Sequence, residues 1–393
     1  MPRKYITRAI EPELHAAAGE FPVVMLTGPR QSGKSTLLRH LFAEKTYTTL
    51  DDPFQRKLAL EDPRLFLENT GGSAVIDEIQ YAPELLSYIK MEVDQQRERV
   101  GRYILAGSQH FPLMQNISET LAGRVATYEL LPFSWPEACL PETLSVPDAF
   151  EVFYKGFHPD PLIHGVNRDR YYSSYLQTYI ERDVRQIMAV QDLSLFQNFI
   201  ELLAARAGSL LNLNEIAKEC GTSFTTAKRW LSLLQSTRVV YLLRPYHKNI
   251  PKRVIKSPKL YFTDTGLLAY LLRYPDARTM QNGPMAGAFF ENFIVTEVLK
   301  HKVNHNAVFQ LYFFRDSNRN EIDLVIEEAQ RVRLFEIKLA RTLRTGDAGQ
   351  LRRQMQYFPH ACATLLSFAE QHVAAGDGTD FAPWTALYGK IEE

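Results

Sequence analysis

Residues 21–42, FPVVMLTGPRQSGKSTLLRHLF, decide the fold of the N-terminal third of the chain. An apolar strand, Val23 to Leu26, leads into the pattern GxxxxGK(S/T) and then into an amphipathic helix. Glycines at this spacing let successive backbone N–H groups turn inward around an anion, and the following helix presents its positive N-terminal end. The stretch therefore predicts a phosphate-binding loop, made of Gly28, Pro29, Arg30, Gln31, Ser32, Gly33, Lys34, Ser35 and Thr36.

The residue types in and after this loop indicate a nucleoside triphosphate as the ligand. Lys34 would reach the β- and γ-phosphates, and the Ser35 hydroxyl would bind Mg²⁺. A second apolar strand, Ala74 to Ile76, ends in Asp77 and Glu78, where a P-loop fold holds its metal. We expect Asp77 to coordinate Mg²⁺ through water and Glu78 to polarise the attacking water. The N-terminal third is therefore predicted to bind and hydrolyse ATP.

Several longer stretches resemble a prokaryotic AAA+ ATPase family whose C-terminal domain is of unknown function. The N-terminal ones are GPRQSGKSTL, TLDDPFQRKLALEDP, VIDEIQ and LAGRVATYELLPFSWPE. The resemblance continues through GFHPDP (156–161), YLQTYIERDVRQI, which ends at residue 187, and KLYFTDTGLLAYLL (259–272). It therefore covers nearly the whole chain and implies an α/β multidomain protein with an AAA+ core.

A third apolar strand, Tyr103 to Ala106, leads into Ser108 and Gln109. In AAA+ ATPases a polar residue at this point lies between the acidic pair and the γ-phosphate, so Ser108 or Gln109 could contact nucleotide. The alternative is a loop residue that only caps the strand.

Three arginines are candidates for nucleotide contact. Arg124 could act as an arginine finger, but only if a neighbouring subunit or domain brings it to the nucleotide. It could equally be an ordinary surface residue. The family resemblance puts Arg182 and Arg185 where a sensing arginine could lie, although helical spacing also allows pairing with Glu181 or solvent.

Residues 195–248 are predicted to form a helix, a second helix, a short turn, a third helix and two strands. Leu213 to Cys220 is amphipathic, with Asn212 or Asn214 placed to cap it. Gly221 supplies the turn before the helix 223–236, in which we expect Trp230, Leu233 and Leu234 to be buried. This is the helix-turn-helix pattern, with a hairpin from Val239 to Leu243 and a basic loop, Arg244 to Lys256, as the wing.

Charge in this region is one-sided. From Cys220 to Thr263 there is no Asp or Glu, whereas nine residues are Lys or Arg. A solvated basic face would explain such a run, and so would contact with a polyanion. We expect DNA contacts, chiefly to phosphates, from the helix residues Thr225, Lys228 and Arg229 and from the wing residues Lys248, Lys252 and Arg253. Winged helices also dock proteins, so a protein partner is the alternative.

The C-terminal part carries the pattern E…D…ExK. Glu291 lies on a largely apolar helix (287–300), Asp323 on a strand of alternating polarity, and Glu336 and Lys338 on one face of the next strand. The order resembles the PD-(D/E)XK nuclease fold, as in Holliday-junction-resolvase-type and restriction-endonuclease-type enzymes. We expect a restriction-endonuclease-like α/β domain.

In such a domain Asp323 and Glu336 would converge on Mg²⁺, and Glu291 would complete the acidic cluster. Lys338 would hold the attacking water and offset charge on the phosphate, with Gln350 in support. The alternatives are ordinary charged strands, or a nuclease fold that binds DNA without cutting it.

Length and composition set the remaining expectations. The chain has 393 residues, of which 45% are hydrophobic and 23% charged, as in a soluble protein of two or three domains. We expect an ATPase core (1–135), a helical lid and linker (136–195), a winged helix (196–256) and the nuclease-like domain (257–393). Three scattered cysteines, no signal peptide and no long apolar run predict a cytoplasmic protein without disulfides or membrane contact.

Three functions remain open. The first is an enzyme that couples ATP state to Mg²⁺-dependent DNA cleavage, favoured by the intact Asp323, Glu336 and Lys338. The second is an ATP-driven DNA-binding switch with a silent nuclease fold. The third is a signalling ATPase that binds proteins, which the acid-free basic run disfavours. Each could act as a homo-oligomer.

Overall fold

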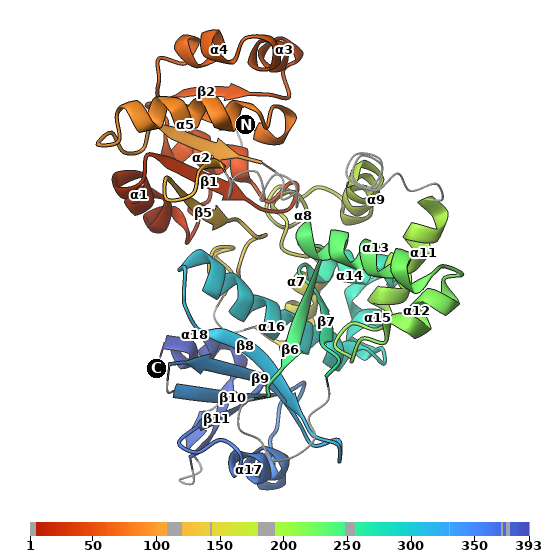
Figure 1. Cartoon of the computed structure of the whole chain (residues 1–393). Helices are drawn as coiled ribbons and strands as arrows, with labels where there is room; N and C mark the ends of the chain where they lie inside the picture. The colour runs from red at the N-terminus through yellow and green to blue at the C-terminus, as the bar shows by residue number, and fades with distance from the viewer. Residues whose placement is uncertain are drawn as a thin grey trace. The chain divides into compact units, whose positions relative to one another are not determined.

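The computed structural model describes residues 5–107, 120–141, 144–179, 193–247, 256–329, 331–370, 372–374 and 378–392 (Figure 1). The chain forms two compact units. The first contains residues 1–133, 236–238 and 303–306, and the second contains residues 134–235, 239–302 and 307–393. In the part of the chain that the structure describes, no helix combines the length and hydropathy that crossing a bilayer requires.

The first unit is built on five parallel strands in the order β2-β3-β4-β1-β5. The strands are β1 (Val23–Thr27), β2 (Thr46–Thr49), β3 (Ala74–Asp77), β4 (Tyr103–Ala106) and β5 (Val125–Glu129). Helix α1 (Glu11–Glu20) precedes β1, and the helices between the strands are α2 (Lys34–Leu41), α3 (Pro53–Glu61), α4 (Pro63–Asn69), η1 (Ile79–Tyr81) and α5 (Leu85–Gln95). Because β4 pairs in parallel with both β1 and β3, the phosphate-binding loop and the acidic strand end lie on the same edge of the sheet.

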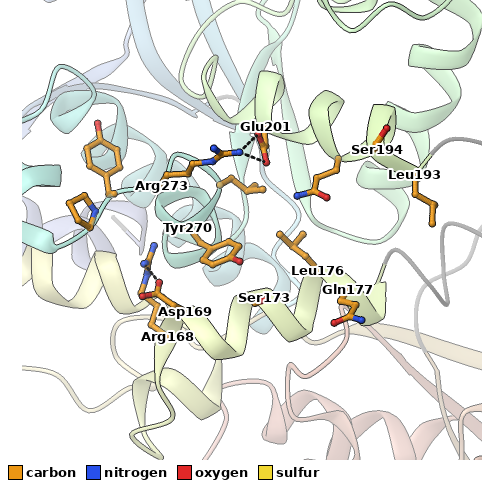
Figure 2. Close-up of a pocket in the computed structure, with 14 residues that line it drawn as sticks. Arg168, Asp169, Ser173, Leu176, Gln177, Leu193, Ser194, Glu201, Tyr270 and Arg273 are labelled. Carbon is orange, nitrogen blue, oxygen red and sulfur yellow. Dashed lines mark hydrogen bonds and ion pairs between the residues drawn. The ribbon is translucent and has the colours of Figure 1, made fainter.

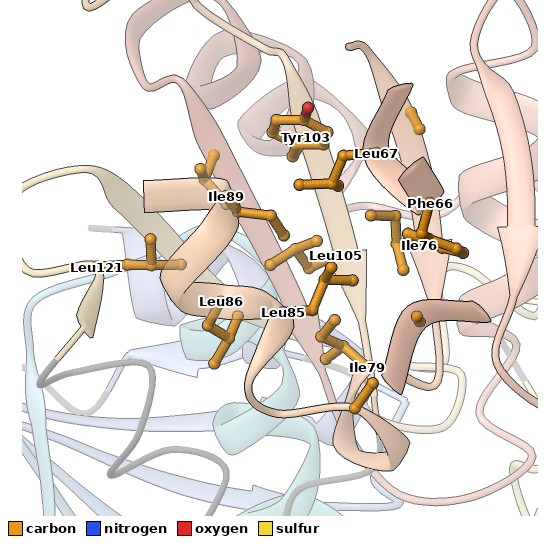
Figure 3. Packing of buried hydrophobic residues seen from close by; sticks show 14 of the residues in the cluster. Phe66, Leu67, Ile76, Ile79, Leu85, Leu86, Ile89, Tyr103, Leu105 and Leu121 are labelled. Carbon is orange, nitrogen blue, oxygen red and sulfur yellow. The ribbon is translucent and has the colours of Figure 1, made fainter. Parts of the chain in front are cut away.

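Both faces of this sheet are buried, as a parallel sheet requires. Val23 and Met25 of β1 join a cluster with residues of α4 and α5, which Figure 3 shows. Val24 and Leu26 point to the opposite face and pack with residues of α1 and α2. The strand is therefore apolar at every position from 23 to 26, which is why this stretch of sequence is an uninterrupted hydrophobic run.

The second unit holds an eight-stranded sheet in the order β12-β13-β11-β10-β9-β8-β6-β7. Its strands are β6 (Val240–Pro245), β7 (Lys259–Phe262), β8 (Gln310–Arg315), β9 (Glu321–Glu328), β10 (Arg331–Lys338), β11 (Cys362–Ser367), β12 (Val373–Ala374) and β13 (Thr379–Pro383). Its helices are α7 (Val146–Lys155), α8 (Pro159–Leu162), α9 (Arg168–Tyr179), α11 (Leu193–Ala204), α12 (Leu213–Glu219), α13 (Phe224–Ser236), α14 (Thr265–Leu271), α15 (Ala277–Asn282), α16 (Ala286–Asn304), η3 (Thr345–Ala348), α17 (Gly349–Met355), η4 (Trp384–Ala386) and α18 (Leu387–Glu392).

The predicted helix-turn-helix segment is α12 followed by α13. Asn212 rather than Asn214 caps α12, because its side-chain oxygen accepts a hydrogen bond from the Glu215 amide at 3.3 Å. Trp230, Leu233 and Leu234 are buried as expected. Both helices therefore follow the residue ranges that their amphipathic patterns predict.

The hairpin after α13 differs from the prediction. We expected two strands before residue 248, but β6 pairs antiparallel with β7, which begins at Lys259. The sheet also continues from β6 into β8 by parallel pairing. The stretch KLYF is wholly buried, which fits a well-covered strand, and it lies beyond the predicted domain boundary at 256. The β6–β7 hairpin and the C-terminal sheet therefore share one strand, β6.

The C-terminal strands follow a simple path. β8, β9 and β10 form an antiparallel meander, and β11 and β13 extend the sheet in parallel beside β10. Helix α16 precedes the meander, and α17 lies between β10 and β11 in the chain. Glu291 on α16, Asp323 on β9 and Glu336 on β10 are thereby placed on the three elements that the sequence predicted.

A buried carboxylate ties three helices of the second unit together. Asp264 caps α14 by accepting from the Leu267 amide at 2.8 Å, and it also accepts from the Phe157 amide and the Tyr172 hydroxyl, both at 2.6 Å. Gly156 has a φ of 81°, and a Cβ there would collide with the Tyr172 hydroxyl oxygen. The motifs GFHPDP and FTDTGLL thus meet in one packing centre between α7, α9 and α14.

We predict that Asp264→Ala lowers the free energy of unfolding by about 3–5 kcal/mol, since it removes a cap, leaves the buried Phe157 amide unpaired and leaves the Tyr172 hydroxyl only the Lys155 carbonyl as acceptor. Urea unfolding followed by circular dichroism would measure the loss. The control is Asp276→Ala, which removes only an exposed cap of α15 (Thr279 amide, 2.6 Å) and should cost about 1 kcal/mol. Equal losses in the two variants would contradict this role of Asp264.

Candidate functional site

The loop between β1 and α2 has the backbone that a phosphate-binding loop needs. Gly28, Gln31 and Gly33 have positive φ angles of 143°, 58° and 96°. Gly33 is the residue before α2 and has no side chain with which to cap it. A Cβ at Gly28 would collide with the Leu130 carbonyl oxygen, so this glycine also permits the close approach of the chain after β5.

Lys34 and Ser32 show what this loop can hold. Lys34 is buried, and its ammonium donates to the Gly28 carbonyl at 3.0 Å and the Pro29 carbonyl at 2.8 Å. The Ser32 hydroxyl is buried and has no hydrogen-bond partner among the residues that the structure describes. A buried hydroxyl without a partner is costly, and a phosphate oxygen would satisfy it. The residues therefore fit a bound phosphate group.

Arg8 supports the loop from outside it. Its guanidinium is buried and donates to the Ser32 carbonyl at 2.9 Å and to the Leu131 carbonyl at 2.8 Å. It also lies over the Phe133 ring, 4.5 Å from the centroid. No local pattern in the sequence signals this contact, because Arg8 is 24 residues from Ser32.

Tyr47 is a second residue that sequence reasoning missed. It lies on β2, beside β3, and its hydroxyl donates to the Asp77 carboxylate at 2.5 Å. Burial, followed by Asp77, raises the pKa of Tyr47 to about 12, while hydrogen bonds with Arg39 and Ser35 act in the opposite direction. Tyr47 therefore stands between Ser35 and Asp77, the two residues predicted to hold Mg²⁺.

Glu78 follows Asp77 in a left-handed conformation, with a φ of 58°, which is unusual for a residue with a side chain. Burial is the main cause that raises the pKa of Glu78, with Lys34 opposing it and Asp77 adding to it. The Gln80 amide donates to the Glu78 carboxylate. A desolvated carboxylate at the edge of the phosphate loop is suited to accept a proton from water.

The other residues predicted to contact nucleotide are not at this loop or fall outside the described residues. Arg124 forms a two-point ion pair with Asp94 of α5, with Nε–Oδ1 and Nη2–Oδ2 distances of 2.6 and 3.0 Å. Its role as a finger toward another subunit stays a prediction. Ser108, Gln109, Arg182 and Arg185 lie outside the described residues, as do the wing residues Lys248, Lys252 and Arg253.

On the helix-turn-helix segment, Thr225, Lys228 and Arg229 are all exposed on α13. Ser223 caps the helix by accepting from the Thr226 amide at 3.1 Å. The exposed face at the start of α13 therefore carries the predicted contact residues.

The structure brings Glu291, Asp323 and Glu336 close together in a C-terminal acidic cluster, with an additional residue among them. Burial first, then Glu291 and Glu336, raises the pKa of Asp323 well above its usual range. Burial also raises the pKa of Glu336 to about 7. The additional residue is Lys259 of β7, whose side chain is only 2% exposed.

Lys259 lies among the carboxylates. Its ammonium nitrogen is 2.8 Å from Glu291 Oε1 and 3.6 Å from Asp323 Oδ1, and it also pairs with Glu321. The Tyr261 hydroxyl donates to Glu291 Oε1 at 2.6 Å. Burial alone would lower the pKa of Lys259, but Tyr261 and the carboxylates raise it well above its usual range. In the sequence, Lys259 stood out only as one of nine basic residues.

The residues predicted to support this cluster also form hydrogen bonds. Lys338 donates to the Asp347 carbonyl at 2.8 Å, Gln350 donates to the Glu321 carbonyl at 3.3 Å, and Asp323 Oδ2 accepts from the Ile337 amide at 2.9 Å. Within the described ranges, no group of three or more His, Cys, Asp or Glu side chains has the geometry of a metal site. Lys259 places an ammonium among these carboxylates, and the metal role of Glu291, Asp323 and Glu336 stays a prediction.

A cavity of about 770 Å³ in the second unit lies apart from these residues (Figure 2). It is lined by α9, α11 and α14, and two ion pairs, Arg273 with Glu201 and Arg168 with Asp169, lie on its wall. None of the predicted site residues lines it.

Comparison with known families agrees with the N-terminal site. Residues 20–139 match an AAA domain, residues 147–278 match the domain of unknown function DUF8612, and residues 286–387 match the domain of unknown function DUF4143. Uncharacterized protein Rv2008c of Mycobacterium tuberculosis and uncharacterized protein Mb2031c of Mycobacterium bovis are each 33% identical over 338 residues, which cover 84% of this chain and 73% of the relative. The first unit is thus an AAA-type ATPase domain.

Two solved structures share more distant likeness. The Walker-type ATPase PABY2304 of Pyrococcus abyssi is 16% identical, with 66% of this chain and 94% of that chain covered at a TM-score of 0.43. A variant of RuvB from Thermotoga maritima is also 16% identical, with coverages of 61% and 90% and a TM-score of 0.32.

We predict that Tyr47→Phe raises the Mg²⁺ concentration for half-maximal ATP hydrolysis about tenfold, because Asp77 loses the donor that orients it. Steady-state hydrolysis over a Mg²⁺ series would measure this. Tyr103→Phe is the matched control, since its hydroxyl donates to the Glu92 carboxylate, also at 2.5 Å, but away from the loop. An unchanged Mg²⁺ requirement in Tyr47→Phe would show that Tyr47 has no part in holding the metal.

Proposed function

This chain belongs to the family of AAA-domain proteins that includes the two mycobacterial relatives, and on that premise we propose that it is a Mg²⁺-dependent ATPase whose nucleotide state controls DNA binding by α12 and α13. The observation that carries the proposal is the convergence of Lys34, the Ser35–Tyr47–Asp77 group and Glu78 on one edge of the sheet. These are the parts that phosphoryl transfer to water requires.

Each residue has a defined task in this proposal. Lys34 exchanges the Gly28 and Pro29 carbonyls for phosphate oxygens when nucleotide binds. Ser35 and Asp77 would hold Mg²⁺, which neutralises charge on the phosphates. Glu78 orients the attacking water and accepts its proton, a task that its raised pKa favours. Arg124 would complete the site only from a second copy of the chain, so hydrolysis is proposed to depend on self-association.

The DNA-binding part of the proposal rests on topology and charge. The short segment around Leu210 runs alongside β7. The Gly208 amide donates to the Leu260 carbonyl at 2.7 Å, and the Leu211 amide donates to the Pro258 carbonyl at 2.8 Å. The order α11, this short segment, α12, α13, β6 and β7 is that of a winged helix. Exposed Lys228 and Arg229 would then neutralise phosphates.

The switch is favoured over a second candidate, Mg²⁺-dependent DNA cleavage. Cleavage would use Asp323 and Glu336 as metal ligands and Lys338 beside the water. The buried ammonium of Lys259, 3.6 Å from Asp323 Oδ1, argues against that use. Binding of protein partners instead of DNA would appear as the absence of salt-sensitive DNA affinity.

Two variants separate nucleotide binding from hydrolysis. We predict that Lys34→Ala lowers ATP hydrolysis at least about 100-fold by removing the phosphate contact. Glu78→Gln should keep ATP binding and lower hydrolysis about 10²- to 10⁴-fold, because only the base is removed. Phosphate release and binding of a fluorescent ATP analogue would measure the two effects, with circular dichroism as the folding control. Retained hydrolysis in Lys34→Ala would refute the assignment of the loop.

The DNA contact is tested by charge reversal on α13. We predict that Lys228→Glu with Arg229→Glu weakens duplex binding about 10- to 100-fold near 0.1 M salt and flattens the log–log salt slope by about 2. The control, Arg170→Glu with Arg353→Glu, makes the same charge change at exposed positions of α9 and α17. Fluorescence anisotropy with and without ATP gives both the affinity and its dependence on nucleotide. Equal effects of the two double variants would move the DNA contact away from α13.

A further inference from the structure

We infer that Lys259 is the resident cation of the C-terminal acidic cluster, so that its ammonium occupies the position a divalent ion would need and the cluster takes no metal. This inference concerns the second unit alone and does not depend on the proposed ATPase or on DNA binding. It explains why the nuclease-like arrangement of carboxylates can persist without a metal.

Two carboxylates, those of Glu291 and Glu321, lie within hydrogen-bond distance of the Lys259 ammonium, and that of Asp323 lies at ion-pair distance. An ammonium group has three donors and no acceptor. Around Lys259 stand three carboxylates, Glu291 from α16 and Glu321 and Asp323 from β9. With the side chain 2% exposed, water supplies little of this solvation, so the carboxylates supply it. The ammonium is therefore bound as an ion is bound, by oxygens from two elements.

A divalent ion bound to Asp323 would lie beside this ammonium. Mg²⁺ requires carboxylate oxygens at about 2.0–2.1 Å in near-octahedral geometry. An ion at that distance from Asp323 Oδ1 would lie no more than about 6 Å from the ammonium, which is itself 3.6 Å from that oxygen. Two positive charges so close in a partly desolvated site repel each other strongly. The remaining oxygen of Asp323, Oδ2, already accepts from the Ile337 amide.

The charge of the cluster is also nearly balanced without a metal. Its carboxylates are Glu291, Glu321, Asp323 and Glu336, and its cations are Lys259, Arg315 and Lys338. Arg315 pairs with Glu321 at 3.0 Å, and Lys338 lies near enough to Glu336 to oppose the rise in its pKa. Four formal negative charges against three positive ones leave little excess charge to attract a dication.

Lys259 cannot readily leave this position. Its backbone lies in β7, paired with Leu243 of β6, and it bridges to Leu210 on the other side. The ammonium also lies 5.7 Å from the centroid of the Phe313 ring on β8. The backbone of Lys259 is therefore held on both sides, and the ammonium could leave the carboxylates only by a rotation of a side chain that is 2% exposed.

The test uses the full chain without nucleotide or DNA, and Mn²⁺ as the probe. Titration followed by electron paramagnetic resonance compares wild type with Asp323→Asn. We expect no Mn²⁺ site below about 1 mM that depends on Asp323. A wild-type Mn²⁺ site that disappears in Asp323→Asn would overturn the inference, whatever the outcome of the ATPase and DNA experiments.

The second arm removes the ammonium by Lys259→Met, which keeps most of the length of the side chain. We expect this variant to gain Mn²⁺ affinity at least about tenfold and to lose it again when Asp323→Asn is added. Its thermal midpoint should rise with Mn²⁺, whereas the wild-type midpoint should not. A folded Lys259→Met chain that gains no affinity would show that something other than the ammonium excludes the metal. If that variant does not fold, the wild-type comparison decides alone.

Discussion

A buried positive charge constrains most of the second unit. Taking an ammonium out of water costs several kcal/mol unless oxygens replace the lost hydration. The ammonium of Lys259 is solvated by carboxylates from α16 and β9, so β7, α16 and β9 have to meet at fixed positions. Farther along α16, Glu297 is fully buried and is neutralised by Lys300 at 2.7 Å, and it accepts from the Trp135 amide at 2.7 Å. Helix α16 thus contributes a carboxylate to each of two buried ion pairs, Lys259–Glu291 and Lys300–Glu297.

Local patterns predicted the elements that carry both sites. β4 spans the predicted residues, and β1 and β3 each extend one residue past the predicted end, because strands buried on both faces form apolar runs in the sequence. The loop from Gly28 to Ser35 was equally predictable, since its glycines and its lysine have their roles within one turn of backbone. Glu291, Asp323 and Glu336 were found in the same way, from helix and strand periodicity. The features that depend on residues close together in the sequence could therefore be predicted.

The residues that sequence reasoning missed owe their roles to topology. Tyr47 contacts Asp77 only because β2 pairs with β3, and Arg8 reaches Ser32 from the segment before α1. Lys259 contacts Glu291 because it lies on β7, the second strand of a hairpin with β6. This strand begins beyond the loop that the sequence predicts to be the wing. The count of basic residues was misleading here for a physical reason. It shows how many cations the segment contains, but it does not show which of them are exposed to water. One of the nine is an internal counter-ion.

The shared strand β6 limits which parts of the second unit could move relative to one another if nucleotide controlled DNA binding as proposed. β6 pairs with β7 on one side and β8 on the other, so the hairpin beside α13 and the meander β8–β10 belong to one sheet. Hydrogen bonds along such a sheet resist hinge motion between its strands, and the ion pairs of Lys259 add to that resistance. A nucleotide-driven change would therefore move α13 together with the C-terminal strands. In such a body the C-terminal strands would support α13, the helix proposed to bind DNA, and this role would need their packing and their balanced charge but no metal chemistry.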